Sequence, residues 1–127
     1  MLGFVIVTHL GIGREMRQAV EEILKEKVPM VVVEVDTLHA TAEFQHQIEL
    51  AISEFQNKDG VLILTDIFGA TPTNLCKDLL AQERIAVVTG INLPMVLKAA
   101  TAHFGQNARE AAEFLKNYGK DTIKTFP

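Results

Sequence analysis

The sequence contains a single cysteine, and it lacks long apolar runs and blocks of like charge. Because Cys76 stands alone, neither a disulfide framework nor a Cys-x-x-Cys redox motif can form. No apolar run approaches the roughly 18 residues that a membrane-spanning helix requires. The first residues also lack the basic segment of a signal peptide and are typical of a strand. We therefore expect a cytoplasmic protein with no membrane insertion.

The charged residues are interspersed, and the formal net charge is −4. Binding to nucleic acid or to a membrane surface depends on clustered lysine and arginine, so the sequence predicts neither partner. The chain has 127 residues and shows no linker, repeat or low-complexity segment. We expect one domain over residues 1–127, large enough to fold without disulfides or metal.

Four short runs rich in valine, isoleucine and leucine alternate with segments in which apolar residues recur at helical spacing. Near-continuous runs of this kind are typical of strands that are covered on both faces. The predicted strands are Gly3–Thr8, Met30–Val35, Val61–Thr65 and Ile85–Thr89. This alternation predicts an α/β fold with a single open, mostly parallel four-stranded sheet and helices on both faces. The run Asp121–Phe126 is predicted to add a short C-terminal strand.

A polar side chain follows each predicted strand. His9 follows the first strand, Asp36 the second, Asp66 the third and Asn92 the fourth. Ligands of open parallel sheets bind beyond the carboxyl ends of the strands. We therefore expect these four side chains at one edge of the sheet.

His9 is the candidate nucleophile, because a neutral imidazole can attack through one ring nitrogen while the other donates a hydrogen bond. A carboxylate that accepts this bond fixes the tautomer and supports the positive charge that develops on the ring. The topology places Asp66 for this role. The alternative is that His9 merely ends a strand and Asp66 begins a turn, but their joint placement at one edge favours a catalytic pair.

Two turns at this edge have the composition of anion sites. Thr71-Pro72 is a helix start signal, and free amides at such a start, next to a turn of small residues, can bind phosphate. The glycines that precede the first helix free the backbone in a similar way. The predicted phosphate-binding residues are Gly11, Gly69, Ala70, Thr71 and Asn92.

The remaining candidates carry weaker signals. His39 and His46 are seven residues apart, which is a poor spacing for metal ligands, and we interpret both as solvated surface. We expect no metal and no cofactor, and we interpret Cys76 as a small buried residue. The apolar residues Leu10, Ile12 and Phe68 are either tucked under the loops of this edge or form a docking rim, and the sequence leaves both open.

Four segments carry a resemblance to a known family: a strand that ends in Thr8-His9, Gly60–Asp66, Gly69–Asn74 and Gly90–Met95. In this order and spacing they resemble the IIA component of the mannose family (mannose, fructose and sorbose type) of the phosphoenolpyruvate-dependent sugar phosphotransferase system. The resemblance covers nearly the whole chain. It departs from the family at Leu10, where glycine is common, and at Ala70 and Thr71, where glycine and serine are common.

The resemblance implies a phosphocarrier with a phosphohistidine intermediate. His9 would accept a phosphoryl group from the phosphocarrier protein HPr and pass it to a IIB component, and Asp66 would orient His9. The sequence stops at Pro127 without a fused IIB domain, so we expect the acceptor to be a separate protein. The resemblance also implies a homodimer whose subunits exchange their last strands.

Other classes of protein share some of these sequence features. A dinucleotide-binding fingerprint fails because Met16 stands where a third small residue is needed. A response-regulator receiver needs an acidic pair for Mg²⁺ after the first strand, where this chain has Thr8-His9. A dihydroxyacetone-kinase phosphotransfer subunit shares the histidine strand but is not expected to have the block Asp66–Asn74. A regulatory phosphocarrier that is not coupled to sugar transport remains open, because it uses the same His9 chemistry.

Overall fold

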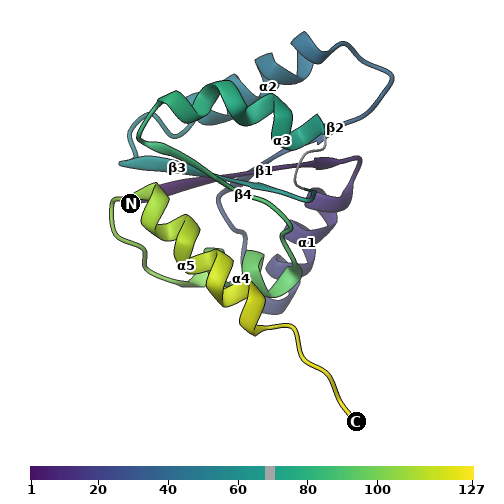
Figure 1. Ribbon diagram of the computed structural model, residues 1–127, viewed down its shortest axis with the longest axis vertical. Coiled ribbons are helices and arrows are strands. Elements are labelled where there is room, and N and C mark those ends of the chain that lie inside the picture. The colour runs from purple at the N-terminus through teal and green to yellow at the C-terminus, as the bar shows by residue number, and fades with distance from the viewer. Residues whose placement is uncertain (68–70) are drawn as a thin grey trace.

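A computed structural model describes residues 1–67 and 71–127 of the chain. Over these residues the fold is α/β, with five α-helices and one open sheet whose strands are all parallel (Figure 1). The strands are β1 (Leu2–His9), β2 (Met30–Val35), β3 (Gly60–Thr65) and β4 (Ile85–Val88). Their order in the sheet is β2-β1-β3-β4. The four predicted strands are confirmed, each end to within one residue.

The helices form a layer on each face of the sheet, as predicted (Figure 1). One layer consists of α1 (Ile12–Leu24), α4 (Leu93–Thr101) and α5 (Ala108–Asp121). The other consists of α2 (Thr41–Ser53) and α3 (Thr71–Cys76), which continues into a 3₁₀ turn over Lys77–Ala81. Within the described ranges, no helix has the length and apolar character that crossing a membrane requires.

The two layers enclose separate hydrophobic cores, and the strands between them supply side chains to both. In β1, Val5 and Val7 point into the core under α2 and α3, whereas Ile6 points into the core under α1, α4 and α5. All six residues of β3 are buried. Because neither face of β1 or β3 meets water, their apolar runs are nearly continuous instead of alternating.

A glycine allows the first helix to begin directly beside the end of β1. A Cβ atom at Gly13 would lie 2.6 Å from Cγ2 of Ile6 and 3.0 Å from Oγ1 of Thr8, closer than packed side chains tolerate. The glycine therefore lets α1 approach the strand that carries His9.

The C-terminal segment differs from its prediction within this single chain. Asp121 is the last residue of α5, and Thr122 still donates its N–H to the carbonyl of Tyr118 at 3.1 Å. Residues 123–127 form no strand and run away from the sheet, so that Phe126 is 92% exposed (Figure 1). A strand needs an edge to pair with, and this tail does not reach the edge of its own sheet. The exchange of this segment between subunits remains a prediction.

Candidate active site

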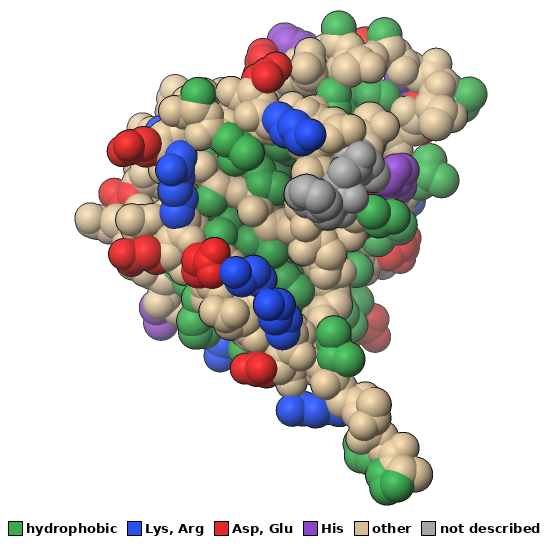
Figure 2. All heavy atoms as spheres, viewed as in Figure 1, with side chains coloured by type: hydrophobic (Ala, Val, Ile, Leu, Met, Phe, Trp, Pro, Cys, Tyr) green, Lys and Arg blue, Asp and Glu red, His purple; other side chains and the backbone are tan. Residues whose placement is uncertain are grey.

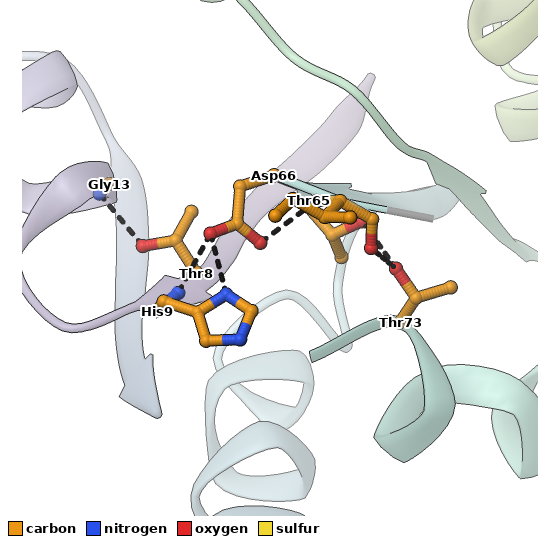
Figure 3. Close-up of polar contacts among 7 residues, drawn as sticks. Thr8, His9, Gly13, Thr65, Asp66 and Thr73 are labelled. Atoms are coloured by element: carbon orange, nitrogen blue, oxygen red, sulfur yellow. Dashed lines mark hydrogen bonds and ion pairs between the residues drawn. The ribbon is translucent and has the colours of Figure 1, made fainter. Parts of the chain in front are cut away.

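Two neighbouring strands bring His9 and Asp66 together, although 57 residues separate them in the sequence. β1 and β3 pair in parallel with Val7 opposite Thr65, so both residues emerge at the same end of the sheet. Nδ1 of His9 lies 2.9 Å from Oδ2 of Asp66, and the backbone N–H of His9 donates to the same oxygen at 3.0 Å (Figure 3). The predicted pairing of His9 with Asp66 is therefore present.

The carboxylate of Asp66 is partly buried, and both of its oxygens accept hydrogen bonds. Its side chain is 10% exposed, and its second oxygen accepts the N–H of Ile67 at 3.0 Å. Burial alone would raise the pKa of Asp66, but the hydrogen bonds from the backbone and ring of His9 hold this pKa below its ordinary value. Asp66 is therefore ionised at neutral pH.

An ionised Asp66 determines which nitrogen of His9 is reactive. The carboxylate can only accept a hydrogen bond, so Nδ1 carries the proton and Nε2 keeps its lone pair. The imidazole is 38% exposed, and Figure 3 shows its second nitrogen directed away from Asp66. The geometry thus presents Nε2 as a nucleophile at the protein surface, with a negative charge behind the ring.

Three buried threonines support the two loops, and sequence reasoning assigned them no role. Oγ1 of Thr8 accepts the N–H of Gly13 at 2.8 Å and fixes the start of α1 (Figure 3). Thr73 donates its hydroxyl proton to the carbonyl of Ile67 at 2.8 Å, so Thr65, 2.9 Å away, must donate to Thr73. The sequence feature that could have indicated their role is a hydroxyl residue at the end of a buried apolar strand, which occurs at Thr8 and again at Thr65.

The predicted phosphate-binding residues have different environments. Gly11 is the cap of α1 and accepts the N–H of Glu15 with its carbonyl at 2.9 Å. Thr71 is exposed and is the first residue of α3, at the helix start that the sequence indicated. Gly69 and Ala70 lie outside the described residues. Phosphate binding by these four residues remains a prediction.

Asn92 has a structural task that its predicted role did not include. Its Oδ1 accepts the N–H of Met95 at 3.0 Å and caps α4, and its Nδ2 donates to Oγ1 of Thr122 at 3.2 Å. The side-chain amide therefore ties α4 to the end of α5. Phosphate binding by Asn92 also remains a prediction.

The other polar residues noted in the sequence lie apart from the His9 pair. His46 is exposed. Asp36 lies in the turn after β2, at the same end of the sheet as His9, and its carboxylate forms a hydrogen bond with the ring of His39. Cys76 is fully buried in the core under α2 and α3, and its thiol donates to the carbonyl of Pro72 at 3.2 Å. Burial raises the pKa of this thiol to about 12, so Cys76 is an inert core residue, as predicted.

Exposed apolar side chains follow His9 and Asp66 in the sequence. Leu10 is 64% exposed, Ile12 45% and Ile67 58%. Leu10 and Ile12 are thus not tucked under their loop, which was one of the two open alternatives, and Phe68 lies outside the described residues. Leu10 also has a φ of 47°, in the left-handed region that costs a residue with a Cβ roughly 1–2 kcal/mol.

This fold and site define a class: α/β proteins in which a surface histidine at the end of a parallel sheet is oriented by a partly buried carboxylate. Comparison with known proteins narrows the class. The family model described as "PTS system fructose IIA component" (EIIA-man) matches residues 3–116. The fructose-specific EIIA component of Bacillus subtilis (strain 168) is 32% identical over 99 residues, which are 77% of this chain and 68% of that protein. The chain belongs to the mannose family of PTS IIA phosphocarriers.

Solved structures agree with this assignment at the level of the fold. The mannose/sorbose-specific IIA subunit from Enterococcus faecalis superposes with a TM-score of 0.88 at 23% identity, covering 98% of this chain and 94% of that one. The EIIA component from Streptococcus agalactiae superposes with a TM-score of 0.87 at 19% identity, covering 99% and 98%.

Proposed function

We propose that this protein accepts a phosphoryl group from HPr on Nε2 of His9 and passes it to a IIB component. The observation that carries the proposal is the pair of hydrogen bonds from His9 to one partly buried oxygen of Asp66. These bonds fix the ring and leave Nε2 free, which is the arrangement that an in-line attack on phosphorus needs. Membership of the family supports the same function, and a carrier between these partners belongs in the cytoplasm.

The transfer step can be written with this chain's own atoms. The lone pair of Nε2 attacks the phosphorus of the donor phosphohistidine, an Nε2–P bond forms, and the donor's N–P bond breaks. The electron pair of the broken bond returns to the donor imidazole. Nδ1 of His9 keeps its proton throughout, and the ionised Asp66 stabilises the positive charge that develops on the ring. Transfer to the acceptor is the same step in reverse, with an acceptor side chain as nucleophile.

Labelling with phosphoenolpyruvate, enzyme I and HPr tests the proposal. The protein should gain one phosphoryl group that is lost in acid and stable in base, as intact mass measures. His9→Ala should gain none. His39→Ala is the matched control, because His39 is also exposed and also paired with a carboxylate, and it should be labelled like the wild type. Equal labelling of His9→Ala and wild type would disprove the assignment.

A regulatory phosphocarrier would share this chemistry and differ only in its acceptor. Transfer from the labelled protein to a IIB component supports the transport function. A labelled protein that transfers to no IIB component and instead alters another protein's activity would support the regulatory alternative.

We further propose that two subunits exchange their C-terminal tails. β4 is an edge strand, and a hollow of about 310 Å³ runs along it between Leu80 and Lys116, lined by Val87 and Thr89. Figure 2 shows hydrophobic side chains in this region, beside basic ones. An unpaired edge of this kind accepts an added strand. The tail 123–127 carries exposed apolar side chains and leaves its own subunit, so it is suited to pair with the partner's β4.

Deletion of residues 123–127 tests this assembly. The deletion spares α5 and the hydrogen bond from Asn92 to Thr122, so the subunit should stay folded. We expect the wild type to be a dimer by light scattering at micromolar concentration, and the truncated protein to be a monomer with unchanged circular dichroism. A monomeric wild type, or a truncated protein that remains a dimer, would contradict strand exchange.

A further inference from the structure

The backbone at Leu10 adopts a conformation that favours glycine. Its φ of 47° lies in the left-handed region, and its N–H is fixed by a hydrogen bond to the carbonyl of Val35 at 2.9 Å. Among the described residues, Leu10 and Lys25 are the non-glycine residues with positive φ. Lys25 ends α1, a place where left-handed residues are common. Leu10 lies instead between the end of β1 and the start of α1, next to His9.

The packing of the described chain does not account for a leucine at this position. Its side chain is 64% exposed and belongs to neither hydrophobic core. Glycine would adopt the same backbone without a Cβ and would keep the bond to Val35. Strain that persists without an internal contact to offset it points to a function for the side chain itself.

The position of Leu10 identifies what its side chain meets. If His9 is the phosphoacceptor, as proposed above, the phosphohistidine of the donor protein must approach to bonding distance of Nε2. The donor's surface must then cover the residue that follows His9, together with the exposed side chains of Ile12 and Ile67. These three apolar residues would lose their contact with water in that complex, which favours association.

From this geometry we propose that Leu10 is a specificity-determining contact for the phosphoryl donor, and that the left-handed backbone next to His9 orients its exposed side chain for this purpose. Leu10 then contributes to the binding of phosphorylated HPr, and it does not take part in the chemical step. This inference rests on the proposed function of His9.

The test is the kinetics of phosphorylation of Leu10→Gly at varied concentrations of phosphorylated HPr. We expect KM to rise about tenfold or more, because a buried apolar contact is lost. We expect kcat to stay within about twofold, because glycine keeps the backbone that positions His9. Leu10→Met retains an apolar side chain and should keep KM close to that of the wild type. Leu10→Asn tolerates the left-handed backbone but is polar, and it should behave like Leu10→Gly.

Lys25→Gly is the matched control. It relieves the same backbone conformation at the other end of the 13-residue α1, away from His9. Lys25→Gly and Leu10→Gly should both be at least as resistant to urea as the wild type, but only Leu10→Gly should raise KM. An equal KM for Leu10→Gly and wild type would overturn the inference, as would a fall in kcat without a change in KM.

Two further outcomes separate this inference from the proposed function. A wild-type protein that HPr does not phosphorylate would refute the proposed function itself. The second outcome is a Leu10→Gly protein that keeps a normal KM for phosphorylated HPr and shows a raised KM for transfer to a IIB component. That result would show that Leu10 contacts the acceptor, and it would refute the proposal that Leu10 contacts the donor.

Discussion

The end of the sheet that carries His9 holds a second pair of the same kind. His9 donates its ring Nδ1–H and its backbone N–H to Asp66, at 2.9 and 3.0 Å. His39 makes the same two contacts with Asp36, also at 2.9 and 3.0 Å. The ring of His39 also reaches the second oxygen of Asp36 at 2.9 Å, so each carboxylate holds its histidine by both the ring and the backbone N–H.

The two pairs differ in what holds the carboxylate. Asp36 and His39 are three residues apart and form a local turn, whereas Asp66 reaches His9 across two strands of the sheet. The side chain of Asp36 is 24% exposed, compared with 10% for Asp66. A histidine can therefore meet a carboxylate in an ordinary turn, and we propose that partial burial at the end of two paired strands is what preorganises His9 as a nucleophile.

The two pairs should differ most in how the rate of phosphorylation responds when the carboxylate of each pair loses its negative charge. Asp66→Asn should slow phosphorylation by saturating HPr about 10²–10⁴-fold, the range for groups that orient and support a reacting centre. An amide carries no charge to stabilise the ring, and its NH₂ can hold His9 in the tautomer whose Nε2 is protonated. Asp36→Asn should react at the wild-type rate. Rapid quench measurements of phosphohistidine check both.

Two results would contradict this expected difference in the rate of phosphorylation. Equal slowing of both variants would mean that the turn after β2 is part of the site. Asp66→Asn at the wild-type rate, with its fold intact by circular dichroism, would mean that Asp66 is only a turn residue.

The two pairs should also differ, by a smaller amount, in how the free energy of unfolding depends on pH. The pKa of Asp66 is lower in the folded protein than in the unfolded chain, where it is near 4. Its ionised form therefore stabilises the fold above about pH 4, and this contribution is lost as the pH falls through the folded pKa. At pH 7, Asp66→Asn should lower the free energy of unfolding by about 1–3 kcal/mol, and the difference should shrink below pH 4. Urea denaturation at pH 7 and pH 3 measures it.

Asp36→Asn serves as the control, with a smaller effect over a different range of pH. The hydrogen bond from His39 lowers the pKa of Asp36, and the same bond raises the pKa of His39. The pair therefore stabilises its turn above about pH 4, and this is lost as the pH rises through the raised pKa of His39. Because both side chains are substantially exposed, solvent screens the interaction. A loss as large as that of Asp66→Asn would contradict the distinction between the two pairs.

The sequence predicted the strands, their parallel arrangement and the meeting of His9 with Asp66. Each of these features follows from the order and pattern of residues along the chain. Apolar runs without alternation mark strands that are buried on both faces, as in Val61–Thr65, whose residues are all buried in the structure. The rule that parallel strands end at one edge then placed His9 and Asp66 together without any knowledge of side-chain geometry.

Where one residue type suits two roles, the sequence could not choose between them. Asn92 before Leu93-Pro94 is a good helix cap and an equally good anion ligand, and only the structure shows its oxygen on the N–H of Met95. Asp36 and Asp66 each follow a strand, yet one forms a local turn and the other a buried partner for His9. The choice depends on which backbone groups are left unsatisfied nearby, and these are known only once the elements pack.

The sequence by itself thus determined the order of the elements and the sheet edge at which His9 and Asp66 meet. The tertiary structure decided the rest: the buried oxygen that accepts both N–H groups of His9, the hydroxyl chain from Thr65 through Thr73, and the left-handed backbone at Leu10. The physical reason is that strand formation depends on a pattern several residues long. Hydrogen-bond partners and backbone strain instead depend on displacements of less than 1 Å between segments that are far apart in the sequence.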